Sequence, residues 1–286
     1  MSAEPPAPAV SVCIPVYQGA EYLDRTIRSI LDQDADLEVV VRDNGSTDGS
    51  SEVVEKFDDP RVRLVRVENT VPMAANWAAT VDLARGELVK IVCADDLIAP
   101  GSLSRQVQTL SADPSLAIAA GRTDMIDGAG RILFPNRHLP KSLLGTRSAL
   151  DVLRTVVRHG GNPIGPSAAL TFRRADYHAV GGLDGGLLFT MDLDLWVRLL
   201  RHGGMHGDAR SAASFRIHGG SASAAASRDE FGMQREFTKR LIEDIEPGIR
   251  RRDRVIGMAG SYAALVKRYG LFVLGTVREQ MDTRRA

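Results

Sequence analysis

The 286-residue sequence contains few cysteines, few aromatic residues and no excess of charge of either sign. Its two cysteines, Cys13 and Cys93, each lie in an apolar, strand-like run, which predicts buried free thiols in a reducing compartment rather than a disulfide scaffold or a metal site. Lys plus Arg and Asp plus Glu both number 36, so no overall field favours nucleic acid as a partner.

Long apolar segments and glycine-rich phosphate loops are also missing. No run of about 20 apolar residues indicates a transmembrane helix, and the Pro/Ala-rich residues 1–9 lack the apolar core of a signal peptide, so we expect a disordered tail there. No G-x-G-x-x-G follows the first predicted strand and no G-x-x-x-x-G-K-[ST] occurs. If a diphosphate binds, a metal ion must neutralise its charge.

Strand and helix patterns alternate through the first third of the chain. Apolar runs predict strands at 10–14, 37–42, 62–67 and from 88, with helices at 20–33, after the turn 44–49, and at 72–86. We expect Pro15 to stop the first strand. The alternation predicts a parallel, doubly wound α/β sheet, and 44% hydrophobic residues suffice for a packed core.

Two adjacent carboxylates, Asp95 and Asp96, follow the buried strand that begins at Leu88. They are predicted to lie at its carboxyl end, where open α/β sheets bind ligands. Neighbouring acids repel each other unless a cation compensates them, which favours a divalent metal held by oxygens. A helix start is the alternative, because either acid could cap the segment leading to Pro100.

The ends of the first two strands are expected to meet the acidic pair in one crevice. Pro15, Val16 and Tyr17 close the first strand and Asp43 closes the second. A nucleotide there could have its base and ribose held by Asp43 and Tyr17, with its phosphates near the acidic pair.

Three blocks in this half together resemble the amino-terminal half of family 2 glycosyltransferases of the GT-A fold, which use nucleotide-sugar donors. They are VSVCIPVYQGAEYLDRTIRSILDQ, LEVVVRDNGSTDGS and GELVKIVCADD, in order across residues 10–96. The resemblance implies a Rossmann-like, mostly parallel central sheet flanked by helices. It also implies a metal ligand at Asp96 and nucleotide contacts at Pro15, Val16, Tyr17, Asp43, Asn76 and Asp95.

Residues 10–99 are predicted to form the nucleotide-sugar-binding half, and residues 100–223 the acceptor-binding and catalytic half of the same domain. In the second half the patterns predict a helix to 110, strands at 116–120 and 131–134 around a turn at 127–128, a helix at 146–159 and a strand at 166–173.

The segment GGLDGGLLFTMDLDLWVRLLRHGG resembles the family's G-G-x-D and E-D-x-D-L-W-x-R elements, in which the aspartate after the glutamate acts as base. Asp192 is the matching position and Asp194 the fallback, while Met191 stands where the family commonly has Glu. Asp192 is also expected to favour the amino terminus of a helix electrostatically, and both roles are compatible. The helix is predicted to face the core through Leu195, Trp196 and Leu199.

The stretch SFRIHGGSAS resembles the family's R-x-H-x-x-S element, whose histidine can complete the metal site. His218 is therefore a candidate ligand, with a hydrogen-bonded loop histidine as the alternative.

Residues 224–286 are predicted to be a helical extension. Residues 247–286 carry nine basic and three acidic side chains, a balance of +6, and the apolar GLFVLGTV within them is too short at eight residues to span a bilayer. A basic amphipathic segment predicts peripheral contact with anionic lipid, and a helical bundle or homodimer interface is the alternative.

The resemblance implies an inverting, metal-dependent, non-processive glycosyltransferase in the cytoplasm or at the inner face of the membrane, using Mn²⁺ or Mg²⁺. UDP-sugar is the default donor, with dTDP- and GDP-sugars open, and the acceptor is a saccharide, a lipid-linked sugar or a small natural product. The alternative is a non-catalytic sugar-nucleotide-binding protein of the same fold. A nucleotidyltransferase would need a glycine-rich, lysine-containing loop, and a processive synthase the Q-x-x-R-W element; the sequence has neither.

Overall fold

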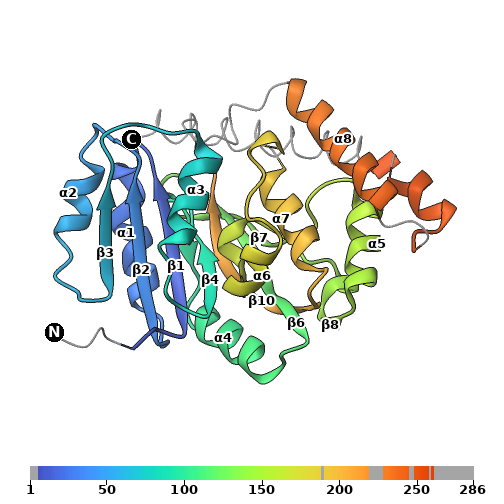
Figure 1. The fold of residues 1–286 in the computed structure, drawn as a ribbon, viewed down its shortest axis with the longest axis horizontal. Coiled ribbons are helices and arrows are strands. Elements are labelled where there is room, and N and C mark those ends of the chain that lie inside the picture. Colours follow the sequence, from blue (N-terminus) through green and yellow to red (C-terminus); the bar gives the residue numbers. More distant parts are fainter. Residues whose placement is uncertain (1–5, 188–189, 219–227, 245–247, 258, 261–286) are drawn as a thin grey trace.

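The computed structural model describes residues 6–187, 190–218, 228–244, 248–257 and 259–260. Within them the chain folds around a ten-stranded sheet with helices on both sides (Figure 1). Along the sheet the strands are β3 (Val62–Arg66), β2 (Leu37–Asp43), β1 (Val10–Val16), β4 (Leu88–Ile91), β9 (Leu170–Arg173), β6 (Leu116–Ile126), β10 (Gly204–Arg216) and β5 (Leu97–Ile98). At its margins β7 (Ile132–Arg137) pairs with β6, and β8 (Gly145–Arg147) pairs with β10.

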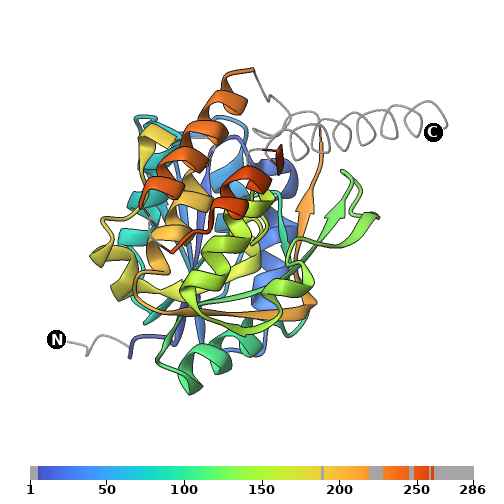
Figure 2. The ribbon, with the colours of Figure 1, turned by 90° about the vertical axis from the view of Figure 1, so that its right-hand side faces the viewer.

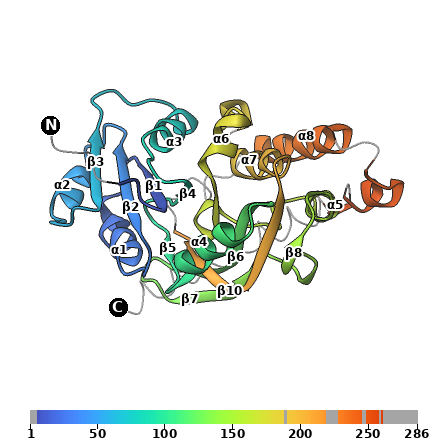
Figure 3. The ribbon, with the colours of Figure 1, turned by 60° about the horizontal axis from the view of Figure 1, so that its bottom comes forward.

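The described helices connect these strands. They are α1 (Ala20–Leu31), α2 (Ser50–Glu55), α3 (Met73–Asp82), α4 (Ser102–Ala112), α5 (Ala149–His159), α6 (Arg174–Ala179), α7 (Met191–Leu199) and α8 (Arg228–Asp244). Three short 3₁₀ turns are η1 (Lys141–Leu143), η2 (Ser167–Ala169) and η3 (Gly185–Leu187). Figure 3 shows α1 and α2 on one side of the sheet and α3, α6 and α7 on the other.

The sheet is parallel in its first half and mixed beyond it. β3, β2, β1 and β4 pair in parallel, and all seven residues of β1 are buried because helices cover both faces. β9 runs antiparallel to both β4 and β6, whereas β10 is parallel to β6. The predicted α/β class is confirmed, and the carboxyl ends of β1, β2 and β4 lie at one edge of the sheet.

Pro15 does not stop the first strand, contrary to our prediction. The carbonyl oxygen of Cys13 accepts from the Val92 amide and that of Val16 from the Asn44 amide, so alternate residues of β1 face β4 and β2. Pro15 faces the β4 side, where the pairing has ended at Cys13 and Ile91. Its missing N–H therefore costs no ladder bond, and β1 continues to Val16.

The ends of several other elements also differ from the prediction. The helix predicted from residue 146 begins at Ala149, because residues 145–147 pair as β8 and the Ser148 hydroxyl caps the helix by accepting from the Asp151 amide. The strand predicted to end at 120 continues to Ile126, since β10 pairs with it over its whole length. Helix α4 starts after Gly101, whose φ is 66°, so neither acid of the 95–96 pair caps it.

The described part of the C-terminal extension packs on α5 (Figure 2). Arg158 Nε donates to Asp253 Oδ1 at 2.7 Å, and Arg154 Nε donates to the Gly248 carbonyl at 3.1 Å. The stretch GLFVLGTV and the basic residues Lys267, Arg268, Arg278, Arg284 and Arg285 lie outside the described residues. No helix among the described ranges combines the length and apolarity needed to cross a bilayer.

At the other end, residues 1–5 of the predicted tail lie outside the described residues. Ala9 is tied to the fold, because its amide donates to Asp36 Oδ2 at 3.1 Å and its carbonyl accepts from Leu88.

Candidate active site

A short turn, residues 93–96, links β4 to β5 at the carboxyl edge of the sheet. The Asp96 amide donates to the Cys93 carbonyl at 3.2 Å, which closes the turn. From α1, the Thr26 hydroxyl lies 2.8 Å from the Ala94 carbonyl oxygen and 2.9 Å from that of Asp96. The helix therefore fixes the backbone from which the two acids project, and we call residues 93–96 the acidic turn.

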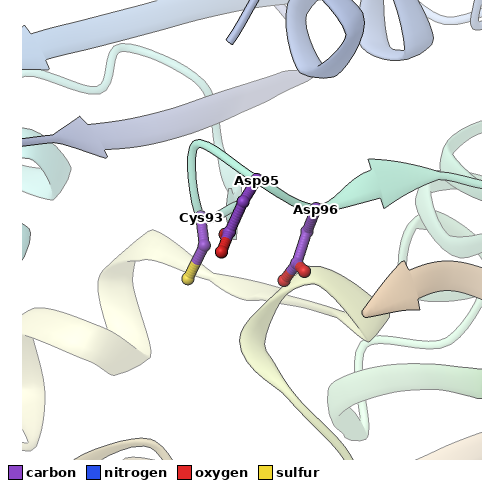
Figure 4. A group of neighbouring side chains, drawn as sticks. All are labelled: Cys93, Asp95 and Asp96. Carbon is purple, nitrogen blue, oxygen red and sulfur yellow. The ribbon is translucent and has the colours of Figure 1, made fainter. Parts of the chain in front are cut away.

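Three side chains of the acidic turn project to the same side (Figure 4). The sulfur of Cys93 and carboxylate oxygens of Asp95 and Asp96 all lie within 4.8 Å of one another. No other group of three or more potential metal-ligating His, Cys, Asp or Glu side chains occurs among the residues that the structure describes. The predicted acidic site therefore forms, and it includes a thiol.

Asp96 has the geometry of a cation ligand. Asp96 is only 1% exposed, and its Oδ1 accepts a hydrogen bond from the Arg216 amide at 3.1 Å. Oδ2 is buried and has no hydrogen-bond partner among the described residues. Burial, followed by the charge of Asp95, raises the pKa of the Asp96 carboxyl. A buried, partnerless oxygen beside a second carboxylate fits an oxygen-preferring divalent cation.

Arg216, the last residue of β10, holds the acidic turn from the other side. Its Nε donates to the Asp95 carbonyl at 2.8 Å, and its Nη1 donates to the carbonyls of Asp127 and Gly128 at 2.9 and 3.0 Å. The guanidinium carbon lies 4.6 Å from the centre of the Tyr22 ring, a cation–π distance. Arg216 thus ties β10, the β6–β7 turn and α1 to the acidic turn.

His218 lies against Asp95 rather than Asp96. Its Nε2 is 3.0 Å from Asp95 Oδ2, and its ring centre is 5.0 Å from that of Tyr22. The sequence placed His218 near the metal, and the structure brings it next to the acidic turn. It is not one of the three side chains whose donor atoms converge within 4.8 Å.

The predicted nucleotide residues gather at the ends of β1 and β2. Val16 pairs in register with Asp43, and Pro15 precedes it in β1. Tyr17 is 56% exposed and therefore accessible to a ligand. Asp43 is buried and its carboxylate is already engaged, accepting the Ser46 amide at 2.9 Å and the Ser51 hydroxyl. In this arrangement Asp43 organises the turn after β2.

Asn76 is likewise committed to the protein. Its Oδ1 accepts from Arg42 and its Nδ2 donates to the Val16 carbonyl at 3.3 Å, so α3 is fixed to the ends of β1 and β2. Beside this edge lies a cavity of about 510 Å³, lined by Gly45, Ser46, Thr47, Arg66, Val67 and Glu68.

Asp192, the candidate base, lies in the first turn of α7. Its negative charge is among those that raise the pKa of the Cys93 thiol in the acidic turn. Its Oδ2 accepts from Asn162 Nδ2 at 3.2 Å. Asp194, the fallback, is instead paired with Arg198 at 2.6 Å. The predicted core stripe is confirmed, since Leu195, Trp196 and Leu199 are fully buried.

Cys93 and Asn162 were not assigned to this site from the sequence. Cys93 was expected to be an ordinary buried thiol, but it shares the turn with the acids; its spacing of two residues from Asp95 was the available signal. Asn162 carried no signal, because only the fold brings the loop after α5 to Asp192.

Comparisons with known proteins bear on this arrangement. Residues 11–181 match the family model described as glycosyl transferase family 2. An uncharacterized protein of Mycobacterium tuberculosis, MT1568, is 32% identical over 227 residues, covering 76% of this chain and 67% of that protein. Other matching proteins, from Rickettsia species, are named uncharacterized glycosyltransferases, and this chain spans only 34–38% of the length of three of them.

Solved structures share the fold. Staphylococcus aureus TarS residues 1–349, in complex with UDP-GlcNAc, superposes with a TM-score of 0.64 at 18% identity, covering 92% of this chain and 73% of that one. The mannosyltransferase PcManGT of Pyrobaculum calidifontis, in complex with GDP-Man and Mn²⁺, gives a TM-score of 0.60 at 20% identity, covering 95% and 80%.

Proposed function

Because the chain belongs to glycosyltransferase family 2 and has the GT-A fold, we propose that this enzyme moves a sugar from a nucleoside-diphosphate sugar to an acceptor hydroxyl, with inversion at the anomeric carbon. The observation that carries the proposal is the acidic turn, where Asp96 lies beside Asp95 and the buried Oδ2 of Asp96 has no hydrogen-bond partner in the described part of the chain. Asp192 supports it, because its charge acts on the Cys93 thiol of this turn and raises the pKa of that thiol.

Asp96, with Asp95 beside it, would hold Mn²⁺ or Mg²⁺. When bound, the cation neutralises the negative charge that grows on the departing diphosphate. His218 stays a candidate ligand, and its contact with Asp95 makes orientation of that carboxylate its first role. Arg216 keeps Asp96 in place through a backbone amide, which leaves Oδ2 for the cation.

Asp192 is proposed as the general base. As the acceptor oxygen bonds to the anomeric carbon, Asp192 takes the hydroxyl proton, and the bond from that carbon to the diphosphate oxygen breaks. The Asn162 amide, donating to Oδ2, orients the carboxylate. Asp194 is a poorer candidate because Arg198 already neutralises it. A single displacement of this kind inverts the anomeric configuration.

The nucleoside is proposed to bind at the ends of β1 and β2. Tyr17 offers an exposed aromatic ring, while Pro15, Val16, Asp43 and Asn76 shape the backbone around it. UDP-sugar is the first choice of donor, supported by the fold shared with the UDP-GlcNAc-bound neighbour, and GDP- and dTDP-sugars follow. The acceptor classes remain a saccharide, a lipid-linked sugar or a small natural product.

Non-processive transfer and a cytoplasmic location belong to the same proposal. The first is supported by the missing Q-x-x-R-W element, and the second by the unpaired thiols of Cys13 and Cys93. The helical segment 251–257 adds peripheral contact with anionic lipid, because Val255 and Ile256 are 64% and 49% exposed next to the exposed Arg251 and Arg252. A homodimer through this segment is the competing arrangement.

Melting of the purified protein with UDP, GDP or dTDP, each with and without Mn²⁺, tests the donor and the metal together. We expect one nucleotide to raise the melting temperature, and to do so only with Mn²⁺, and we expect the matching nucleotide sugar to release its diphosphate on incubation with acceptor candidates. If no nucleotide shifts the melting temperature with any divalent cation, the proposed site is wrong.

A further inference from the structure

The two cysteines of this protein are in different chemical surroundings. Cys13 lies in β1, fully buried, and its Sγ is 3.6 Å from the Thr80 carbonyl oxygen, as expected of a core thiol. Cys93 is only partly buried and lies in the acidic turn, with its sulfur within 4.8 Å of the carboxylate oxygens of Asp95 and Asp96. Figure 4 shows the sulfur and the carboxylates on the same side of the turn.

A second observation indicates that this group holds a cation. The Asp96 side chain is almost fully buried, and its Oδ2 has no hydrogen-bond partner within the described residues. A buried carboxylate oxygen without a donor is costly, and a cation shared with Asp95 and Cys93 would compensate it. Two hard oxygens and one soft sulfur then face the same point.

We propose that Cys93 is a ligand of the donor-binding cation and that it shifts the preference of this enzyme from Mg²⁺ toward softer cations that accept sulfur, in particular Co²⁺, Zn²⁺ and Cd²⁺. This inference rests on the proposed function, because it concerns the same metal site. Mg²⁺ demands oxygen ligands, whereas thiolates select softer ions.

The chemistry of the step is a simple exchange. On binding, the thiol proton leaves to solvent, a sulfur–metal bond forms and no atom changes its oxidation state. Because the Cys93 sulfur lies within 4.8 Å of two carboxylate oxygens, a thiolate at this place is electrostatically unfavourable until a cation binds. A bound cation reverses the unfavourable electrostatics, so metal binding and loss of the proton occur together.

Co²⁺ titration of the full chain tests the ligand directly. The wild type should show a sulfur-to-cobalt charge-transfer band in the near ultraviolet, with and without UDP. Cys93→Ser should lack the band and bind Cd²⁺ at least about tenfold more weakly, with Mg²⁺ affinity changed by less than about twofold. Cys13→Ala is the control and should keep the band, because the Cys13 sulfur contacts the Thr80 carbonyl and is not part of the group formed by Cys93, Asp95 and Asp96.

Cys93→Asp provides a second variant with an oxygen donor at the same place. It should bind Mg²⁺ more tightly than the wild type and Cd²⁺ more weakly, and a far-ultraviolet circular dichroism spectrum equal to that of the wild type would show that it folds. If Mn²⁺ binds but the band is absent and Cys93→Ser keeps its Cd²⁺ affinity, Cys93 is not a ligand and the proposed function stands. If no divalent cation binds even with UDP, both the ligand and the proposed metal dependence are refuted.

Discussion

Replacing Asp96 by Asn should reverse the order of stability between variant and wild type when a cation is added. The substitution keeps the acceptor for the Arg216 amide and removes the buried charge. Its cost is a hydrogen bond to a neutral instead of a charged acceptor, about 1 kcal/mol. Burial and the charge of Asp95 raise the pKa of the Asp96 carboxyl well above its ordinary value. Removing the charge should therefore stabilise the metal-free protein, by about 1.4 kcal/mol for each pH unit of that rise.

Proton linkage decides whether the raised pKa of Asp96 stabilises or destabilises the metal-free wild type at neutral pH. A carboxyl group whose pKa is higher in the folded state loses stability as the pH rises from the unfolded pKa to the folded one, so the metal-free wild type pays this cost at neutral pH. We therefore expect Asp96→Asn to melt at or above the wild-type temperature in EDTA. With Mn²⁺ and UDP at about 100 times the dissociation constant, the wild type should gain about 2.7 kcal/mol, or roughly 5–10 °C, and the variant much less.

Differential scanning fluorimetry in EDTA and in Mn²⁺ with UDP measures both quantities. Asp24→Asn is the control, because that acid lies in an exposed ion pair with Arg28 and should change stability by less than about 1 kcal/mol in both buffers. An Asp96→Asn protein that melts lower than the wild type in EDTA, or that gains as much as the wild type from Mn²⁺ with UDP, would refute the interpretation of Asp96 as an uncompensated cation ligand.

Three further predictions concern the base, the sheet and the C-terminal segment. Asn162→Ala removes the hydrogen bond to Asp192 and should lower kcat by roughly 10–100-fold while the donor affinity is unchanged. Steady-state kinetics and a donor titration measure the two quantities. A lower donor affinity with an unchanged kcat would contradict the prediction. Lys90 is buried and donates to the carbonyls of Ala168 and Leu170, and burial lowers its pKa to about 7. The free energy of unfolding should therefore rise with pH from about 7 toward the pKa of a lysine in the unfolded chain, near 10.4. Lys90→Met should flatten that rise in denaturant melts at pH 7 to 9, and an unchanged slope would show that another group causes it. The double variant Val255→Ser with Ile256→Ser should bind anionic vesicles at least about tenfold more weakly than the wild type in flotation assays, because each exposed side chain contributes up to roughly 1.5–3 kcal/mol when buried. Equal binding of the wild type to neutral vesicles would contradict a preference for anionic lipid. No binding to either vesicle, together with a doubled mass in solution, would favour a dimer interface instead.

The sequence predicted most of the parallel half of the fold, because there each strand is a short apolar run between clear turn signals. It failed where pairing partners decide the outcome. Pro15 is harmless only because β4 has ended on its side, and the extent of β6 depends on β10, which lies far along the chain. Such facts are tertiary, and no local pattern carries them.

The residues of the candidate site were likewise predicted only in part. Asp95 and Asp96 could be predicted because they are adjacent acids after a buried strand, and the family resemblance indicated Asp192. The role of Asn76 within the protein, and the placement of His218 on Asp95, could not be predicted, because they depend on hydrogen bonds between residues 34 to 123 positions apart. Cys93 was not assigned to the site, although it lies only two and three residues before the acids, because its apolar strand-like run predicted a core thiol.

The most direct test of the account is the Asp192→Asn variant, assayed for donor binding and for transfer in the same Mn²⁺ buffer. The amide can still accept a hydrogen bond from Asn162 but cannot take a proton. We predict a donor dissociation constant within about twofold of the wild type and a transfer rate lower by roughly 10²–10⁴-fold. Full transfer activity in this variant would contradict the central claim that Asp192 deprotonates the acceptor.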